Sequence, residues 1–383
     1  MSENEFESIR PYTDAEAEKA LGRVSRHPMI PSISKYLFPD KPANTLKRRL
    51  RQITSVDQFQ DEVMSDVVES IIRTTSAGFT CNGIEHLKAV KGRFLAISNH
   101  RDIVLDPALI QYALKCAWLP YTEICVGSNL LSNRLIEDLM RSNRMIKVIR
   151  GIKARELYLS SRRLSNYIRE SIVSGRSSIW IAQREGRTKN GLDTTEQGLL
   201  KMFDMSGTKD FVQNFLELNI IPLSISYEYE PCDILKAREI LISRTQKYVK
   251  TENEDLQSIM LGIKQWKGNV HLNFGDPLTE DEIRAASLCD KNDRYQLIRH
   301  AVDVRVINGY KLWNTNYIAY DLANHTFKYA DRYTHEEAEA FTEFTEHQLD
   351  QVEPTLNRAE LRDIFLRIYG NPVMMKEKFE AEG

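Results

Sequence analysis

Apolar residues recur along the chain at two different spacings, and the change of spacing divides the chain into three parts. Before residue 78 and after residue 280 the spacing is typical of helices, with apolar side chains three or four positions apart over residues 56–71, for example. In the middle part, short apolar runs end in polar loops and alternate with helical stretches. These runs are RFLAIS (93–98), EICVGS (123–128), MIKVIR (145–150), SSIWIAQ (177–183), NIIPLSISYEY (219–229) and NVHLNFG (269–275).

Strands separated by helices predict an α/β fold, with a mostly parallel sheet flanked by helices. We therefore predict an N-terminal helical region over residues 1–77, an α/β domain over 78–280 and a C-terminal helical extension over 281–383. The extension is rich in aromatic residues, which we interpret as core.

The charge balance argues against nucleic acid as a partner. The 383 residues include 52 Lys and Arg against 54 Asp and Glu, a formal net charge of −2. Any anion must therefore be bound by a local cluster of basic residues. The five cysteines contain no Cys-x-x-Cys pair, and their odd number suits a reducing compartment.

The N-terminus and the hydropathy pattern predict where the protein works. MSENEFESIR is acidic and lacks the apolar run of a signal peptide. No stretch reaches the roughly 18 apolar residues that a membrane-spanning helix needs. We therefore expect a cytoplasmic protein, or one that lies against a membrane without crossing it.

The first candidate for chemistry is SNHRDIVLDP (98–107), which follows a predicted strand. His100 lies there with Asp102 and Asp106 close behind it. Loops at the carboxyl ends of strands bind ligands in α/β sheets, and a histidine whose second ring nitrogen faces a carboxylate is suited to act as a general base. The alternative is a loop histidine without a catalytic role, in which Asp106 caps the next helix and Asp102 pairs with Arg101.

Two basic stretches follow other predicted strands. QREGRTKNG (183–191) combines two glycines, which permit a tight backbone, with Arg187 and Lys189. Arg150 ends a strand within the basic segment 134–155. Because arginine makes bidentate contacts with phosphate oxygens, both stretches are candidates for anion binding. The alternative is that they are solvated turns and helix faces.

Taken in order, four motifs resemble those of the glycerolipid acyltransferase family, which includes glycerol-3-phosphate and 1-acylglycerol-3-phosphate acyltransferases. The motifs are SNHRDIVLD, VIRG, WIAQREGRTKNG and IIPLSISYE. The resemblance covers about residues 78–280 and identifies that region as an acyltransferase domain.

The chain departs from the family pattern at two places. Five residues separate His100 from Asp106 where the family has four. Alignment by the following helix favours Asp106 as the partner of His100, and Asp102 remains a rival because it is nearer in sequence. In the third motif, the family's arginine corresponds to Arg187 or is replaced by Lys189.

By this resemblance, the protein moves a fatty acyl chain from an acyl thioester to the hydroxyl of glycerol-3-phosphate or 1-acylglycerol-3-phosphate in membrane phospholipid synthesis. His100 acts as the general base, and Asp106 holds and polarises it. Acyl-coenzyme A or acyl-acyl carrier protein is a co-substrate, and neither a cofactor nor a metal is expected, since the eight histidines show no ligand spacing. The residues expected to bind the substrate are Asn99, Arg150, Glu185, Gly186, Arg187 and Lys189.

Two other functions stay open. One is an O-acyltransferase of a lyso-aminolipid, such as a lyso-ornithine or lyso-glycine lipid. The other is a catalytically inactive relative that binds lipid or acyl carrier protein, which the lengthened loop after His100 motivates.

Acyl-chain substrates imply membrane lipids as partners, and we expect peripheral attachment at the inner face of the membrane. Basic residues at 47–51 are the candidates for contact with anionic lipid. The alternative is an ordinary helix with a basic solvated side. The apolar residues that accompany them are Ile30, Ile33, Tyr36, Leu37 and Phe38.

Overall fold

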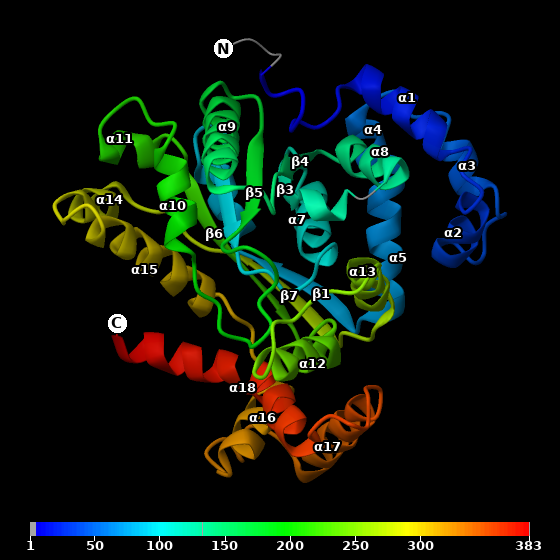
Figure 1. Cartoon of the computed structure of the whole chain (residues 1–383), viewed down its shortest axis with the longest axis vertical. Helices are drawn as coiled ribbons and strands as arrows, with labels where there is room; N and C mark the ends of the chain where they lie inside the picture. The colour runs from blue at the N-terminus through cyan, green and yellow to red at the C-terminus, as the bar shows by residue number, and fades with distance from the viewer. Residues whose placement is uncertain (1–4, 132, 383) are drawn as a thin grey trace.

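A single twisted sheet organises the computed structural model, which describes residues 5–131 and 133–382 (Figure 1). In those residues the sheet has seven strands in the order β1-β7-β6-β2-β5-β3-β4. The strands are β1 (Gly78–Asn82), β2 (Leu95–Ser98), β3 (Thr122–Gly127), β4 (Met145–Val148), β5 (Ser178–Ala182), β6 (Ile220–Tyr227) and β7 (Asn269–Phe274).

The predicted α/β class with a mostly parallel sheet is confirmed. Five strands, β6, β2, β5, β3 and β4, run in one direction. β7 pairs with β6 in the antiparallel sense, and β1 follows β7 in parallel, so these two strands at one edge run in reverse. The carboxyl ends of the five parallel strands therefore meet at one edge of the sheet.

Helices cover both faces of the sheet, because side chains along each strand alternate between them. In β2, Leu95 and Ile97 pack into a core that includes residues of α9 (Ala154–Val173), α10 (Gln197–Asp204) and α15 (Asp293–Asn308). Ala96, between them, packs into the opposite core, which includes residues of α5 (Ser65–Thr75) and α7 (Leu105–Cys116). The central strands are consequently buried on both sides, which explains why they read as continuous apolar runs.

The first 77 residues are mainly helical where they are described; α1 packs against α8, and α2 packs against α5 (Figure 1). The helices are α1 (Asp14–Val24), α2 (Ile30–Leu37), α3 (Thr45–Leu50), α4 (Val56–Phe59) and a π-helical turn at Gln60–Met64 that leads into α5. The remaining helices of the central part are α6 (Ile84–Ala89), α8 (Arg134–Ser142), α11 (Phe211–Leu216), α12 (Asp233–Ser243), α13 (Glu254–Lys264) and the 3-10 turn Ser128–Leu130.

The C-terminal part is helical, and α18 runs back across the molecule to pack against α12, α15 and α16. A third apolar core joins α12 to α16, α17 and α18. These helices are α14 (Glu280–Ser287), α16 (Asn314–Asn324), α17 (His335–Leu349) and α18 (Arg358–Glu382). Among the described residues, no helix combines the length and the apolar character that crossing a bilayer requires.

Candidate active site

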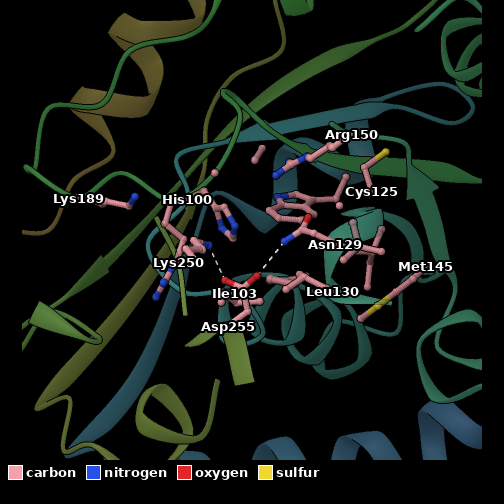
Figure 2. A pocket seen from close by; sticks show the side chains of 18 residues that line it. His100, Ile103, Cys125, Asn129, Leu130, Met145, Arg150, Lys189, Lys250 and Asp255 are labelled. Carbon is pink, nitrogen blue, oxygen red and sulfur yellow. Dashed lines mark hydrogen bonds and ion pairs between the residues drawn. The ribbon is translucent and has the colours of Figure 1, made fainter. Parts of the chain in front are cut away.

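Three of the predicted motifs meet around one cavity of about 110 Å³ at the carboxyl ends of the parallel strands (Figure 2). His100 follows β2, Arg150 follows β4, and Gly186, Arg187 and Lys189 follow β5, and all five residues line the cavity. They converge because parallel neighbouring strands place their following loops at one edge of the sheet.

His100 is paired with Asp106. The Nδ1 of His100 lies 2.8 Å from the Oδ2 of Asp106, and the imidazole ring points into the cavity in Figure 2. Because Nδ1 faces a carboxylate, it carries the ring proton, which leaves Nε2 with a free lone pair. The ring also meets Trp180 edge to face, with 5.9 Å between ring centroids. This arrangement suits Nε2 to accept a proton.

Asp106 is fully buried and held by four donors. Its Oδ2 accepts the backbone N–H groups of Arg101 at 2.6 Å and Asp102 at 2.9 Å besides the His100 ring. Its Oδ1 accepts the Tyr227 hydroxyl at 2.8 Å. Burial, reinforced by the negative charge of Asp106, raises the pKa of Tyr227 well above its ordinary value, so this hydroxyl remains a donor. Four donors on one carboxylate fix its position and stabilise its charge where burial removes it from solvent.

Asp102 has a different position. Its Oδ1 accepts the backbone N–H groups of Val104 and Leu105 at 2.9 and 2.8 Å, which caps the start of α7. Its Oδ2 is buried against Gly262 of α13, where an added Cβ would lie 2.1 Å from that oxygen. Burial and the nearby charge of Asp106 raise the pKa of Asp102.

The start of the helix after the first motif differs from the hypothesis in which Asp106 caps that helix. α7 begins at Leu105, and Asp106 lies inside its first turn, so Asp106 is not the cap. Between His100 and Asp106 the loop forms a turn that Asp102 stabilises through the N–H groups of Val104 and Leu105. The ring and the Asp106 carboxylate meet in spite of the longer loop.

Asn99 lies behind the cavity and does not line it. It is fully buried, and its side chain bonds both the N–H and the C=O of Ile225 in β6, at 2.8 and 3.0 Å. It also donates to Asp193 at 3.1 Å. These bonds clamp the exit of β2 to β6, so Asn99 acts on the position of the His100 loop.

Basic side chains surround the mouth of the cavity. Arg150 approaches Gly127 so closely that a Cβ there would lie 3.0 Å from its guanidinium carbon. One terminal nitrogen of Arg187 is buried and has no hydrogen-bond partner among the described residues. Lys189 pairs with Glu239 of α12. Glu185 is largely exposed outside the cavity and lies 3.7 Å from Arg150.

A buried polar network joins the His100 loop to the C-terminal part. The Arg101 guanidinium donates to Asp193 at 2.6 Å and lies 3.5 Å from Glu230. Burial disfavours the charge of Arg101, but these two carboxylates outweigh burial and raise its pKa. Tyr310 donates to Asp193 at 2.5 Å, and Lys236 donates to the carbonyl of Arg101 at 2.7 Å.

A groove of about 360 Å³, lined by both apolar and polar side chains, adjoins the cavity on the side of α9 and α10. The two spaces share Cys125, Arg150 and Ala182 as lining residues. The apolar side chains along the groove are Val148, Ile149, Ile152, Leu157, Leu164, Ile181, Leu199 and Met202.

Sequence reasoning missed several residues of this site. Tyr227 holds Asp106, and Asn129, Lys250 and Asp255 line the cavity. Tyr310 anchors Asp193 from the C-terminal part. No local spacing connects these residues with His100, because they come from other segments of the chain. The only sequence signal was the position of Tyr227 and Asn129 at strand ends.

The family comparison agrees with the interpretation of the motifs. Residues 78–226 match the family model described as Acyltransferase. A search of curated protein sequences finds no match. Among solved structures, the chain is similar to the crystal structure of the 1-acyl-sn-glycerophosphate acyltransferase from Thermotoga maritima. That similarity has a TM-score of 0.34 and 11% sequence identity, and it covers 72% of this chain and 92% of the other.

Proposed function

The chain is an acyltransferase, with a domain of the glycerolipid acyltransferase family at residues 78–226, and from that premise we propose its substrates and mechanism. The donor is a fatty acyl thioester, carried by coenzyme A or acyl carrier protein. The acceptor is the hydroxyl of glycerol-3-phosphate or 1-acylglycerol-3-phosphate, in membrane phospholipid synthesis. The observation that carries this proposal is the His100–Asp106 pair at the edge of a cavity lined by cations.

His100 is the general base of the proposed reaction. Its Nε2 takes the proton of the acceptor hydroxyl as the hydroxyl oxygen attacks the thioester carbonyl. The imidazolium that forms faces the Asp106 carboxylate, which stabilises the new positive charge. When the tetrahedral intermediate collapses, the carbon–sulfur bond breaks and the leaving thiolate takes the proton back from His100. The base is then restored, and the products are an ester and a free thiol.

The structure favours direct transfer over an acyl-enzyme intermediate. Cys125 is the cysteine that lines the cavity among the described residues, and it is buried. Burial, helped by the charge of Glu123, raises the pKa of the Cys125 thiol far above its ordinary value. Since the thiolate is the nucleophilic form, Cys125 is a poor nucleophile at neutral pH.

The cations support a phosphate-bearing acceptor. Arg150, Arg187 and Lys189 approach the cavity from the loops after β4 and β5. A phosphate monoester carries up to two negative charges and several acceptor oxygens, so it uses more of these donors than the single carboxylate of a lyso-aminolipid. We therefore prefer the phosphate acceptor to the aminolipid. We disfavour the hypothesis of a catalytically inactive relative. It was suggested by the longer loop after His100, and that loop leaves His100 and Asp106 in contact.

The adjoining groove is suited to an acyl chain. The cavity of about 110 Å³ is small, whereas the groove is larger, has a row of apolar side chains in its lining and shares Cys125 and Arg150 with the cavity. We place the acyl chain in this groove, with the thioester carbonyl at the junction of the two spaces.

Contact with membrane lipids at the inner face of the membrane is part of the same proposal. The structure narrows the residues that could make it, because Ile30 and Phe38 are buried and cannot insert into lipid. Tyr36 is about half exposed on α2, and the side chains of Arg48 and Arg51 lie at the surface nearby in sequence. An aromatic ring beside cations is suited to an anionic interface.

The decisive experiment measures product formation by the purified protein. Palmitoyl-coenzyme A and palmitoyl-acyl carrier protein are offered as donors, with glycerol-3-phosphate, 1-acylglycerol-3-phosphate and lyso-ornithine lipid as acceptors. We expect ester formation with a phosphate acceptor, lost in His100→Ala and kept in His335→Ala, a control at an exposed histidine. If only lyso-ornithine lipid accepts the acyl chain, the acceptor is an aminolipid and the proposed phosphate acceptor is wrong. A folded protein that transfers to none of them would refute the proposed reaction.

A further inference from the structure

The segment between β6 and β7 lies outside the region that matches the family model, yet it forms one wall of the His100 cavity. The model match ends at residue 226, and the segment, residues 228–268, contains α12 and α13. Two of its residues, Lys250 and Asp255, line the cavity together with His100. The wall is therefore a feature of this chain that the matched family region does not supply.

Lys250 and Asp255 belong to a bridge across the mouth of the cavity. Asp255 accepts from the Lys250 ammonium at 2.5 Å through Oδ1 and from the side-chain amide of Asn129 at 3.0 Å through Oδ2. Asn129 comes from the loop after β3, on the other wall, and Figure 2 shows both contacts meeting at Asp255. The Lys250 side chain is 47% exposed, so its ammonium is accessible from the mouth.

The side chains that donate to Asp255 are of the kinds that bind anions. Burial raises the pKa of Asp255, but hydrogen bonds from Lys250 and Asn129 and the charge of Arg187 outweigh burial and lower it below its ordinary value. Asp255 is thus a stable carboxylate. It satisfies two donors that would otherwise face the cavity with no anion to bind.

The wall is fixed at two points, one on the His100 loop and one on the loop after β5. Gly262 of α13 packs directly on Asp102, leaving no room for a side chain. Glu239 of α12 pairs with Lys189, another cavity residue. These contacts set the position of Lys250 relative to His100, so the ammonium belongs to a defined site.

We infer that Lys250 is a fourth cation for the anionic head of the acceptor, and that Asp255 holds Lys250 and Asn129 in place until that head arrives. The ligand class is a phosphate monoester, bound by Lys250 together with Arg150, Arg187 and Lys189. The charged residues lining the cavity are then four cations and one carboxylate. This inference rests on the proposed phosphate acceptor.

The test compares Lys250→Gln with Lys250→Arg and with Lys247→Gln, a control in the same exposed loop whose side chain does not line the cavity. Loss of one charge-assisted bond in Lys250→Gln raises KM for glycerol-3-phosphate or 1-acylglycerol-3-phosphate about tenfold. The kcat at saturating acceptor stays near that of the wild type, because Lys250 does not touch the reacting hydroxyl. Lys250→Arg retains most of the affinity, and Lys247→Gln matches the wild type.

A second measurement keeps this inference separate from the proposed reaction. Calorimetric titration with inorganic phosphate needs no turnover, and we expect weaker binding by Lys250→Gln than by Lys247→Gln. Asp255→Asn changes the charge in the opposite direction, so it binds phosphate more tightly than the wild type. Equal phosphate affinity in the two glutamine variants, or no binding by the wild type, overturns the role of Lys250. Absence of turnover with intact phosphate binding refutes the reaction alone.

Discussion

Replacing Asp106 and Asp102 separately by asparagine is the sharpest test of the site, because the two carboxylates lie close together and have different partners. Asp106 accepts four hydrogen bonds, one of them from the His100 ring. In Asp106→Asn the amide oxygen can keep the contacts of Oδ2, but its NH₂ group then faces the Tyr227 hydroxyl, which must turn to accept. The negative charge that stabilises the imidazolium is lost in every arrangement.

The magnitude follows from what that charge does. General acid–base catalysis contributes about 10²–10⁴-fold to a rate, and its benefit depends on a correctly held and stabilised imidazole. We therefore expect Asp106→Asn to lower kcat by about 10²–10⁴-fold. Its charge-assisted bonds become neutral ones, which costs about 1–3 kcal/mol of folding free energy. The protein remains folded, so the rate loss is measured on a native enzyme.

For Asp102→Asn, in contrast, we expect little change in activity or stability. The amide oxygen can accept the N–H groups of Val104 and Leu105 as Oδ1 does. The substitution also removes a buried carboxyl whose pKa is already raised by burial and by Asp106. We expect kcat within about threefold of the wild type and a melting temperature that is unchanged or higher.

The assay is initial-rate acyl transfer from palmitoyl-coenzyme A, with thermal unfolding of each variant measured in the same buffer. The reasoning is refuted if Asp102→Asn loses as much activity as Asp106→Asn. It is also refuted if Asp106→Asn keeps more than about a tenth of the wild-type kcat, since general-base assistance is worth more than that.

Three further predictions concern the polar network beside the site, a buried carboxyl group and the surface proposed to contact lipid. Tyr310→Phe removes the hydroxyl that donates to Asp193; unfolding in urea should show a loss of about 1–2 kcal/mol, accompanied by a lower kcat, and an unchanged midpoint would contradict the role of the network. Burial raises the pKa of Asp303 to about 6, so the proton it binds stabilises the fold below about pH 4, and this contribution is lost as the pH rises through 6. As the pH rises from 4 to 7, the free energy of unfolding of Asp303→Asn should therefore rise relative to that of the wild type by about 2 kcal/mol, seen as a relative increase in its melting temperature. A difference in melting temperature that stays constant over this range would argue against the raised pKa of Asp303. Exchange of Arg48 and Arg51 for serine should weaken sedimentation with anionic phosphatidylglycerol vesicles and leave that with phosphatidylcholine vesicles unchanged; equal binding would remove this surface from the membrane proposal.

Local pattern was sufficient for six of the seven described strands, and it missed β1, whose residues are only partly buried. RFLAIS, SSIWIAQ and the other runs contain those six strands to within a residue or two at each end, because strands buried on both faces are apolar at successive positions. The reversed direction of β7 was not predictable, since NVHLNF has the same pattern whichever way it runs. The direction of β7 depends on the long connection through α12 and α13, and the hydrophobic periodicity of the sequence does not determine the path of that connection.

The site was predictable only where its residues follow strands. His100, Arg150 and Arg187 occur directly after apolar runs, so their meeting follows from a parallel sheet. The choice between Asp102 and Asp106 depended on where α7 begins, and a shift of one residue at a helix start is below what sequence pattern can determine. Lys250 reaches the cavity from the far end of a distant loop, and only the fold places it there.

The bond between Tyr310 and Asp193 also has a consequence for protein synthesis. Tyr310 follows Asp193 by 117 residues, so at ordinary translation rates the ribosome needs on the order of ten seconds to add it. During that time the face of the sheet later covered by Val302 and Val306 of α15 is open to water. The nascent chain therefore exposes this apolar face until α15 has been synthesised and can cover it.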